Sequence, residues 1–73
     1  MQPLTQVPKG KSGKIIAIAG LSQRDRQRLY DLGLMPNSRL MVVQTTPLFI
    51  VRVFDTEIAI DRLTAAAILL GTD

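Results

Sequence analysis

The side chains that could do chemistry in this chain are carboxylates and basic groups, because cysteine and histidine are both absent. Their absence excludes disulfides, thiolate nucleophiles, a histidine base and zinc sites built from Cys and His. A hard cation would need several oxygen ligands from one shaped loop. No such loop is visible around the acidic residues, which we interpret as solvated side chains: Asp25, Asp31, Asp55, Glu57, Asp61 and Asp73.

The segment Gly10-Lys11-Ser12 matches the end of a phosphate-binding loop, G-x-x-x-x-G-K-[ST]. The first glycine of that motif would fall at position 5, which is Thr5, and the motif should open a helix rather than precede a strand. We therefore interpret the segment as a glycine-rich turn. No serine has a base at a readable spacing, so we predict no enzyme, no catalytic residue and no cofactor.

The formal net charge is +3, and its densest basic feature is the group Arg24, Arg26, Arg28 and Arg39. Acidic residues interrupt the positive stripe that a nucleic-acid groove would need, and aromatic residues, at 4%, are too few to stack bases. We predict no nucleic-acid partner. The group is either a solvated helix face or a docking face for an acidic protein, with Arg24 and Arg28 as the contact residues.

A second candidate contact follows Pro47, where Leu48 and Phe49 begin an apolar run. A strand of this kind can send one face into a core and leave an aromatic side chain exposed, and exposed aromatic residues can anchor a partner. We therefore predict that Leu48 and Phe49 belong to the partner-binding surface. The alternative is that a helix or the N-terminal segment covers them.

The length of 73 residues predicts a single domain over residues 1–73. Alternating and β-branched runs predict five strands at 14–19, 39–45, 48–54, 57–61 and 68–70. Ser22 as cap and Gly33 as stop predict a helix over 23–32, and Pro36-Asn37 is typical of a type II turn. Residues 62–64 are expected to form a turn, and 65–67 could be helical.

Five short strands are best accommodated by closing, or nearly closing, one sheet into a barrel. Leu4 and Val7 should touch the core, and Leu29 and Leu32 should cover one open end. The alternation predicts these inward residues: Ile16, Ile18, Leu40, Val42, Val51, Val53, Ile58, Ile60, Ile68 and Leu70.

The longest strictly apolar run, 65–70, is far shorter than the ~20 residues of a membrane span. The apolar stretch after Lys14 is likewise too short for a signal peptide. We therefore expect a cytoplasmic protein without membrane insertion. The open strand edges of a small barrel can pair edge to edge, which makes self-association a further expectation.

The order of these pieces resembles the FeoA family of bacterial ferrous iron uptake. The resemblance rests on the Gly10/Gly13 turn, the run R-L-x-D-L-G-L-x-P over 28–36, the later Pro47-Leu48 pair, and the alanines at 65–67. The same module is similar to the C-terminal domain of diphtheria-toxin-type iron-dependent repressors. Three departures from the family pattern are Pro36-Asn37 in place of Pro-Gly, the missing Gly-Asp-Pro loop after Leu48 and the missing hairpin glycine near Asp55-Thr56.

The resemblance implies a mainly β fold, a small SH3-like barrel of about five strands with one short helix inserted after the first strand. It also implies a role with a transition metal ion, iron(II), as a cytoplasmic accessory of the FeoB-type membrane transporter. The family has no agreed catalytic or iron-ligand residues, so none is carried over to this chain. The leading hypothesis is a non-enzymatic docking module, and the alternative is a regulatory sensor barrel that binds a metal, a nucleotide or a DNA-linked partner.

Overall fold

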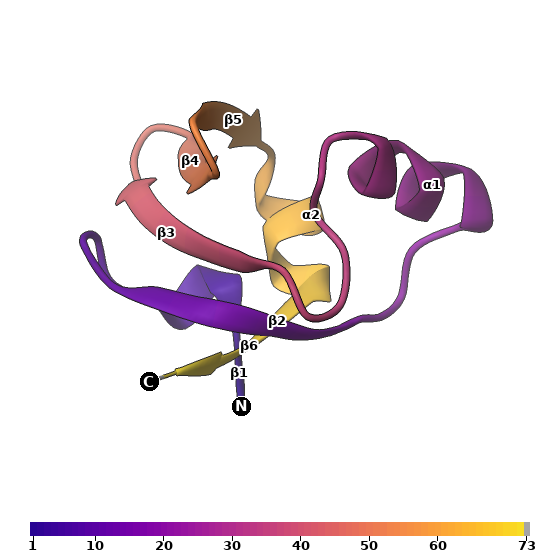
Figure 1. Ribbon diagram of the computed structural model, residues 1–73, viewed down its shortest axis with the longest axis horizontal. Coiled ribbons are helices and arrows are strands. Elements are labelled where there is room, and N and C mark those ends of the chain that lie inside the picture. Colours follow the sequence, from indigo (N-terminus) through magenta and orange to yellow (C-terminus); the bar gives the residue numbers. More distant parts are fainter. Residues whose placement is uncertain (73) are drawn as a thin grey trace.

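The computed structural model describes residues 1–72, and it shows a mainly β protein with two α-helices (Figure 1). Strand β1 (Gln2–Pro3) and the 3₁₀-helix η1 (Leu4–Gln6) form the N-terminal segment, and α1 (Gln23–Asp31) is inserted after the first long strand, β2 (Ser12–Ile18), as predicted. Neither helix of the described chain is long and apolar enough to cross a membrane. The elements are β1 (Gln2–Pro3), η1 (Leu4–Gln6), β2 (Ser12–Ile18), α1 (Gln23–Asp31), β3 (Arg39–Gln44), β4 (Phe49–Val53), β5 (Thr56–Ile60), α2 (Arg62–Ala67) and β6 (Ile68–Thr72).

The six described strands form one antiparallel sheet in the order β1-β6-β2-β3-β4-β5. The expectation of about five strands in a closed or nearly closed barrel is therefore confirmed only in part, because there are six described strands and the sheet is not closed. The physical reason is that β5 runs directly into α2, which packs against η1, β1 and β6. Barrel closure would require a strand that is hydrogen-bonded to the edge strand β5, but the chain forms α2 directly after β5.

Strand β2 contains the one error in the predicted inward set. Ile15 is fully buried and Ile18 is nearly so, whereas Ile16 is 47% exposed. The pairing between β2 and β6 shifts between Ile15 and Ala17, so that Ile16 is the extra residue of a β-bulge. A bulge reverses the alternation of the strand beyond it, which is why Ile15 replaces Ile16 in the core.

The other predicted inward residues are confirmed, since all nine are buried together with Leu4 and Val7. Leu29 is buried as expected, but Leu32 is 48% exposed and does not cover the core. Leu34 takes that place and is fully buried. The expectation for Leu32 is wrong because the helix ends at Asp31 and the chain then reverses at Gly33.

Helix α1 begins and ends with the local interactions that its sequence predicts. The Ser22 hydroxyl oxygen accepts a hydrogen bond from the backbone N–H of Asp25 at 3.2 Å. Gly33 has a φ of +92° and its N–H donates to the carbonyl oxygen of Tyr30 at 2.9 Å. The following turn is also as predicted, because Asn37 has a φ of +79°.

Helix α2 is longer than expected, because residues 62–64 are helical rather than a turn. Its cap is Asp61, whose carboxylate accepts a hydrogen bond from the backbone N–H of Thr64 at 2.7 Å. An aspartate at the N-cap satisfies a backbone N–H that has no partner within the helix. Asp61 is therefore a structural cap as well as an exposed carboxylate.

Candidate functional site

The exposed face of α1 carries the two arginines predicted to contact a partner. Arg24 and Arg28 are both exposed and lie four residues apart, so they share one face of the helix. Within residues 1–72, neither forms an ion pair with Asp25 or Asp31, and Asp31 instead accepts a hydrogen bond from the Gln27 side chain at 3.0 Å. Both guanidinium groups are thus available to a partner.

Arg26 has a different environment from Arg24 and Arg28. Its Nη2 atom donates to the carbonyl oxygen of Leu21 at 3.4 Å. Its Nε atom is buried and has no hydrogen-bond partner among the described residues. Arg26 thus packs against the segment that leads into α1.

The two residues of the second candidate contact have different environments in the structure. Leu48 is 51% exposed, as a contact residue should be, whereas Phe49 is only 5% exposed. Phe49 is the first residue of β4 and lies opposite Ile60 of β5, with its side chain in the core together with Val51 and Val53. The expectation that Phe49 is an exposed anchor is therefore wrong, because the strand places its odd-numbered residues inward.

Leu48 and the C-terminal end of α1 lie at opposite ends of β4. A Cβ atom placed on Gly33 would lie 3.7 Å from Cγ1 of Val53, the last residue of the strand. Leu48 precedes the first residue, and five residues at ~3.3 Å each separate the two ends by ~17 Å. The structure thus places Leu48 apart from the end of α1 that follows Arg28.

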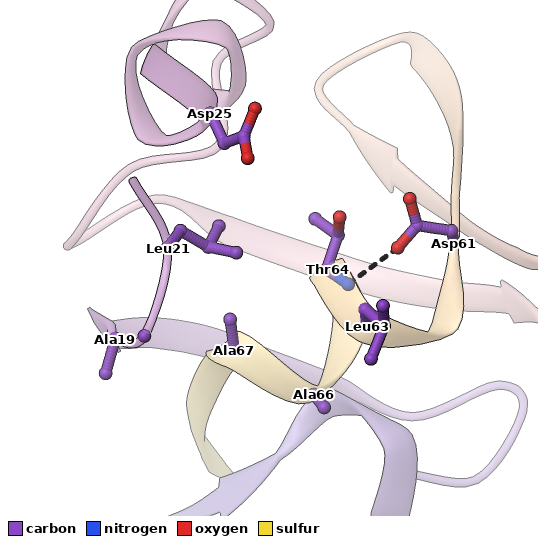
Figure 2. Close-up of a pocket in the computed structure, with 9 residues that line it drawn as sticks. Ala19, Leu21, Asp25, Asp61, Leu63, Thr64, Ala66 and Ala67 are labelled. Atoms are coloured by element: carbon purple, nitrogen blue, oxygen red, sulfur yellow. Dashed lines mark hydrogen bonds between the residues drawn. The ribbon is translucent and has the colours of Figure 1, made fainter. Parts of the chain in front are cut away.

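A cleft of about 490 Å³ lies between the segment leading into α1 and helix α2 (Figure 2). Leu21 and Leu63 line it with three alanines, and Asp25 of α1 and Asp61 before α2 contribute carboxylates to its lining. The hydrogen bond from the Thr64 backbone N–H is the main cause that lowers the pKa of Asp61. The sequence analysis missed this cleft, although the pattern D-x-x-T at 61–64 signals the cap that forms one wall.

The tip of the β4–β5 hairpin is a further exposed feature that the sequence analysis missed. Phe54 is 85% exposed and has a φ of +57°. Arg52 and Glu57 flank the turn and form an ion pair of 2.6 Å across the two strands. The residue type of Phe54 gave no signal, because a phenylalanine is not typical of a left-handed turn position, and only the missing hairpin glycine beside it pointed to this turn.

The positive charge excess of the chain is confined to its N-terminal part. Residues 1–22 contain Lys9, Lys11 and Lys14 and no acidic residue, while the remaining six arginines equal the six acidic residues in number. All three lysines are exposed, around the turn before β2, and in Figure 1 this turn lies on the opposite side of the molecule from α1.

Metal-binding side chains are not gathered anywhere in the described chain. Residues 1–72 contain no group of three or more acidic, cysteine or histidine residues that could hold a metal ion. Asp25 and Asp61, at the cleft, are two carboxylates with no third donor of this type beside them.

Comparison with known proteins identifies the domain. The model of the FeoA domain family matches residues 2–70. The fold is similar to the crystal structure of an iron uptake regulatory protein (FeoA), with 26% identity, a TM-score of 0.86, and coverage of 96% of this chain and 93% of that one. The zinc complex of FeoA from Stenotrophomonas maltophilia, a procaryotic SH3 domain protein, has 21% identity, a TM-score of 0.81, and coverage of 97% and 91%.

The same fold occurs in a manganese-dependent transcriptional repressor, with 18% identity and a TM-score of 0.88. The match covers 97% of this chain but 41% of the repressor, so this domain corresponds to only part of that protein. A comparison with curated protein sequences finds no match.

Proposed function

Because the chain belongs to the FeoA family, we propose that it is a non-enzymatic, cytoplasmic accessory protein of bacterial ferrous iron uptake. In this proposal it docks to the cytoplasmic part of a FeoB-type transporter and favours one conformation of that transporter. A bound protein shifts a conformational equilibrium only through different affinities for the two states. Two relatives support the iron context: one is called an iron uptake regulatory protein, and a role as a ferrous iron transport activating factor has been suggested for the other.

The observation that carries the docking proposal is the exposed face of α1. Arg24 and Arg28 both point away from the core, and neither is paired with Asp25 or Asp31. Exposed charges of this kind steer association and select partners of opposite charge. We assign Arg24 and Arg28 to the contact with an acidic surface of the transporter.

Leu48 stays in the proposal as a separate apolar contact, since it is half exposed but lies at the other end of β4 from the end of α1. Phe49 leaves the proposal because its side chain is buried. A transporter surface that touched both Arg28 and Leu48 would have to extend along the length of β4.

The test measures binding of the full chain to the transporter reconstituted in lipid nanodiscs. We expect R24E/R28E to raise the Kd at least about tenfold, because two attractive charges become repulsive. The matched control is K9E/K11E, which changes the net charge equally at a turn distant from α1. We expect the control to stay within about threefold of the wild-type Kd.

Three outcomes would contradict this proposal in different ways. Unchanged binding of R24E/R28E removes α1 from the contact surface, and an equal loss in K9E/K11E assigns the effect to net charge alone. No binding of the wild-type chain overturns the docking function. In that event, calorimetry with iron(II), GTP and DNA tests the sensor role, which measurable affinity for any of the three would favour.

A further inference from the structure

We propose that Phe54 is an apolar anchor, with which the tip of the β4–β5 hairpin enters an apolar pocket bordered by basic residues on a protein partner. This inference rests on the proposed docking function and adds a second point of contact to it. It depends on three observations: the backbone conformation of Phe54, the exposure of its ring, and the charges beside it.

The backbone at Phe54 is in a conformation that its side chain disfavours. Val53 and Thr56 are paired, so Phe54 and Asp55 form a two-residue turn. In the described chain the non-glycine residues with positive φ are Asn37 and Phe54. Asparagine tolerates this region, but a bulky residue there is an outlier, and the first central position of such a hairpin turn favours glycine.

The ring of Phe54 is not packed against the core formed by the described residues. The side chain is 85% exposed and does not belong to the cluster of buried residues or to the side chains packed against it. The turn therefore contains a residue that strains the backbone and exposes an aromatic ring to water. Strained positions and unused apolar side chains are typical of binding sites, where the partner supplies the missing contact.

The charges at the tip indicate what kind of partner would fit. Arg52 and Glu57 neutralise each other at 2.6 Å. Asp55 forms no ion pair within residues 1–72 and leaves the tip with a net negative charge. An aromatic anchor for a lipid surface is normally flanked by Lys or Arg, and the lysines of this chain lie instead around the turn before β2. The tip therefore fits a protein pocket with a basic rim better than a membrane.

The position of the tip connects it with the face of α1. Val53, which precedes Phe54, lies against Gly33 at the C-terminal end of α1. A partner that contacts the end of α1 can therefore reach the hairpin tip without crossing the length of the sheet. We therefore assign Phe54 to the same transporter, in a pocket with a basic rim that adjoins the acidic surface proposed for Arg24 and Arg28.

The central experiment uses F54G in the full chain, with thermal unfolding and binding to the nanodisc-embedded transporter as separate readouts. We expect the unfolding midpoint to rise, because glycine adopts positive φ without strain. We expect the Kd to increase at least about tenfold, since an aromatic anchor is lost. A folding defect cannot produce this combination, because a variant that is more stable than the wild type is folded.

Two matched variants define the cause of the lost binding. F54L keeps an apolar side chain on the strained backbone, and we expect its Kd within about threefold of wild type. L63A removes a side chain that is equally exposed, at 84%, but on α2, and we expect no change in Kd.

D55K tests the charge of the partner pocket. It should slow association, because a lysine would face the basic rim.

Each result supports or overturns the inference. An unfolding midpoint of F54G at or below that of wild type would contradict backbone strain at Phe54. Unchanged binding of F54G would overturn the role of Phe54 as an anchor, while the docking function would stand. Equal losses of affinity in L63A and F54G would mean that exposed apolar side chains bind the transporter non-specifically. Binding to empty nanodiscs that F54G loses would assign Phe54 to lipid instead of protein. A wild-type chain that binds neither empty nor transporter-loaded nanodiscs overturns the docking function together with this inference.

Discussion

The backbone N–H of Leu34 donates to the carbonyl oxygen of Leu29 at 2.9 Å, across the C-terminal end of α1, and both side chains are buried. The N–H of Gly33 donates to Tyr30 in the same turn, which completes a Schellman motif. Leu29 and Leu34 are therefore packing residues, and Gly33 allows the chain to reverse between them.

Replacement of Gly33 by alanine should destabilise the protein by about 1 kcal/mol, because its φ of +92° disfavours any side chain. A steric contribution is not expected, since the new Cβ would meet Val53 at 3.7 Å, an ordinary contact distance. G33N should cost less than G33A, because asparagine tolerates this region. Urea unfolding measures both, and equal stability of G33A and wild type would contradict the assignment.

Gly13→Ala should destabilise the protein for a different reason. A Cβ atom at this position would lie 2.7 Å from the backbone carbonyl oxygen of Gly71 in the neighbouring strand. One of the two strands would have to move, and overpacking of this kind typically costs about 1–3 kcal/mol. We expect G13A to be less stable than G33A, and the reverse order in urea unfolding would show that β2 and β6 can separate easily.

The bulge in β2 predicts opposite sensitivities for two adjacent isoleucines. Ile15→Ala should cost about 2–5 kcal/mol, because it leaves a cavity in the core. Ile16→Ala should cost about 1 kcal/mol or less, because the side chain is half exposed. If the two variants lost equal stability on chemical unfolding, the bulge would not be where we place it.

Asp61 should contribute to stability in a pH-dependent way. Its pKa is lowered from the ordinary value of 3.8, chiefly by the hydrogen bond from the Thr64 backbone N–H. The stabilisation is present above pH 3.8 and is lost as the pH falls through the lowered folded-state pKa. D61N keeps an acceptor for the cap but cannot titrate, so thermal unfolding at pH 7 and pH 2.5 should show a smaller acid loss in D61N than in wild type.

Much of the fold could be predicted because apolar residues recur at a clear spacing of two along several segments. Strict alternation at Glu57–Asp61, and Val51 and Val53 at a spacing of two, gave the correct inward residues. The segment 15–18 is apolar at every position, so either alternation fits it equally well. The ladder with β6 decides which side chains face inward, and no local signal in β2 reports the pairing shift.

The candidate site was less predictable, for reasons that differ from residue to residue. Counting back by two from Val51 would have placed Phe49 in the core, but the apolar run Leu48-Phe49-Ile50 obscured that signal. Asp61 was not recognised as a helix cap because residues 62–64 were expected to form a turn. The only signal near Phe54 was the missing hairpin glycine beside it, because the residue type of Phe54 contradicts the backbone that it adopts.

The three lysines of residues 1–22, which contain no acidic residue, give one end of β2 a local excess of positive charge. Lys9 and Lys11 precede that strand and Lys14 is its third residue, whereas α1 follows the other end of the strand (Figure 1). An anionic surface would align the molecule through this end of β2 as well as through the arginines of α1, so the two ends compete for it. This alignment weakens as salt shortens the range of the field to about 8 Å, so ionic strength becomes a variable that sets which end of the molecule meets its partner first.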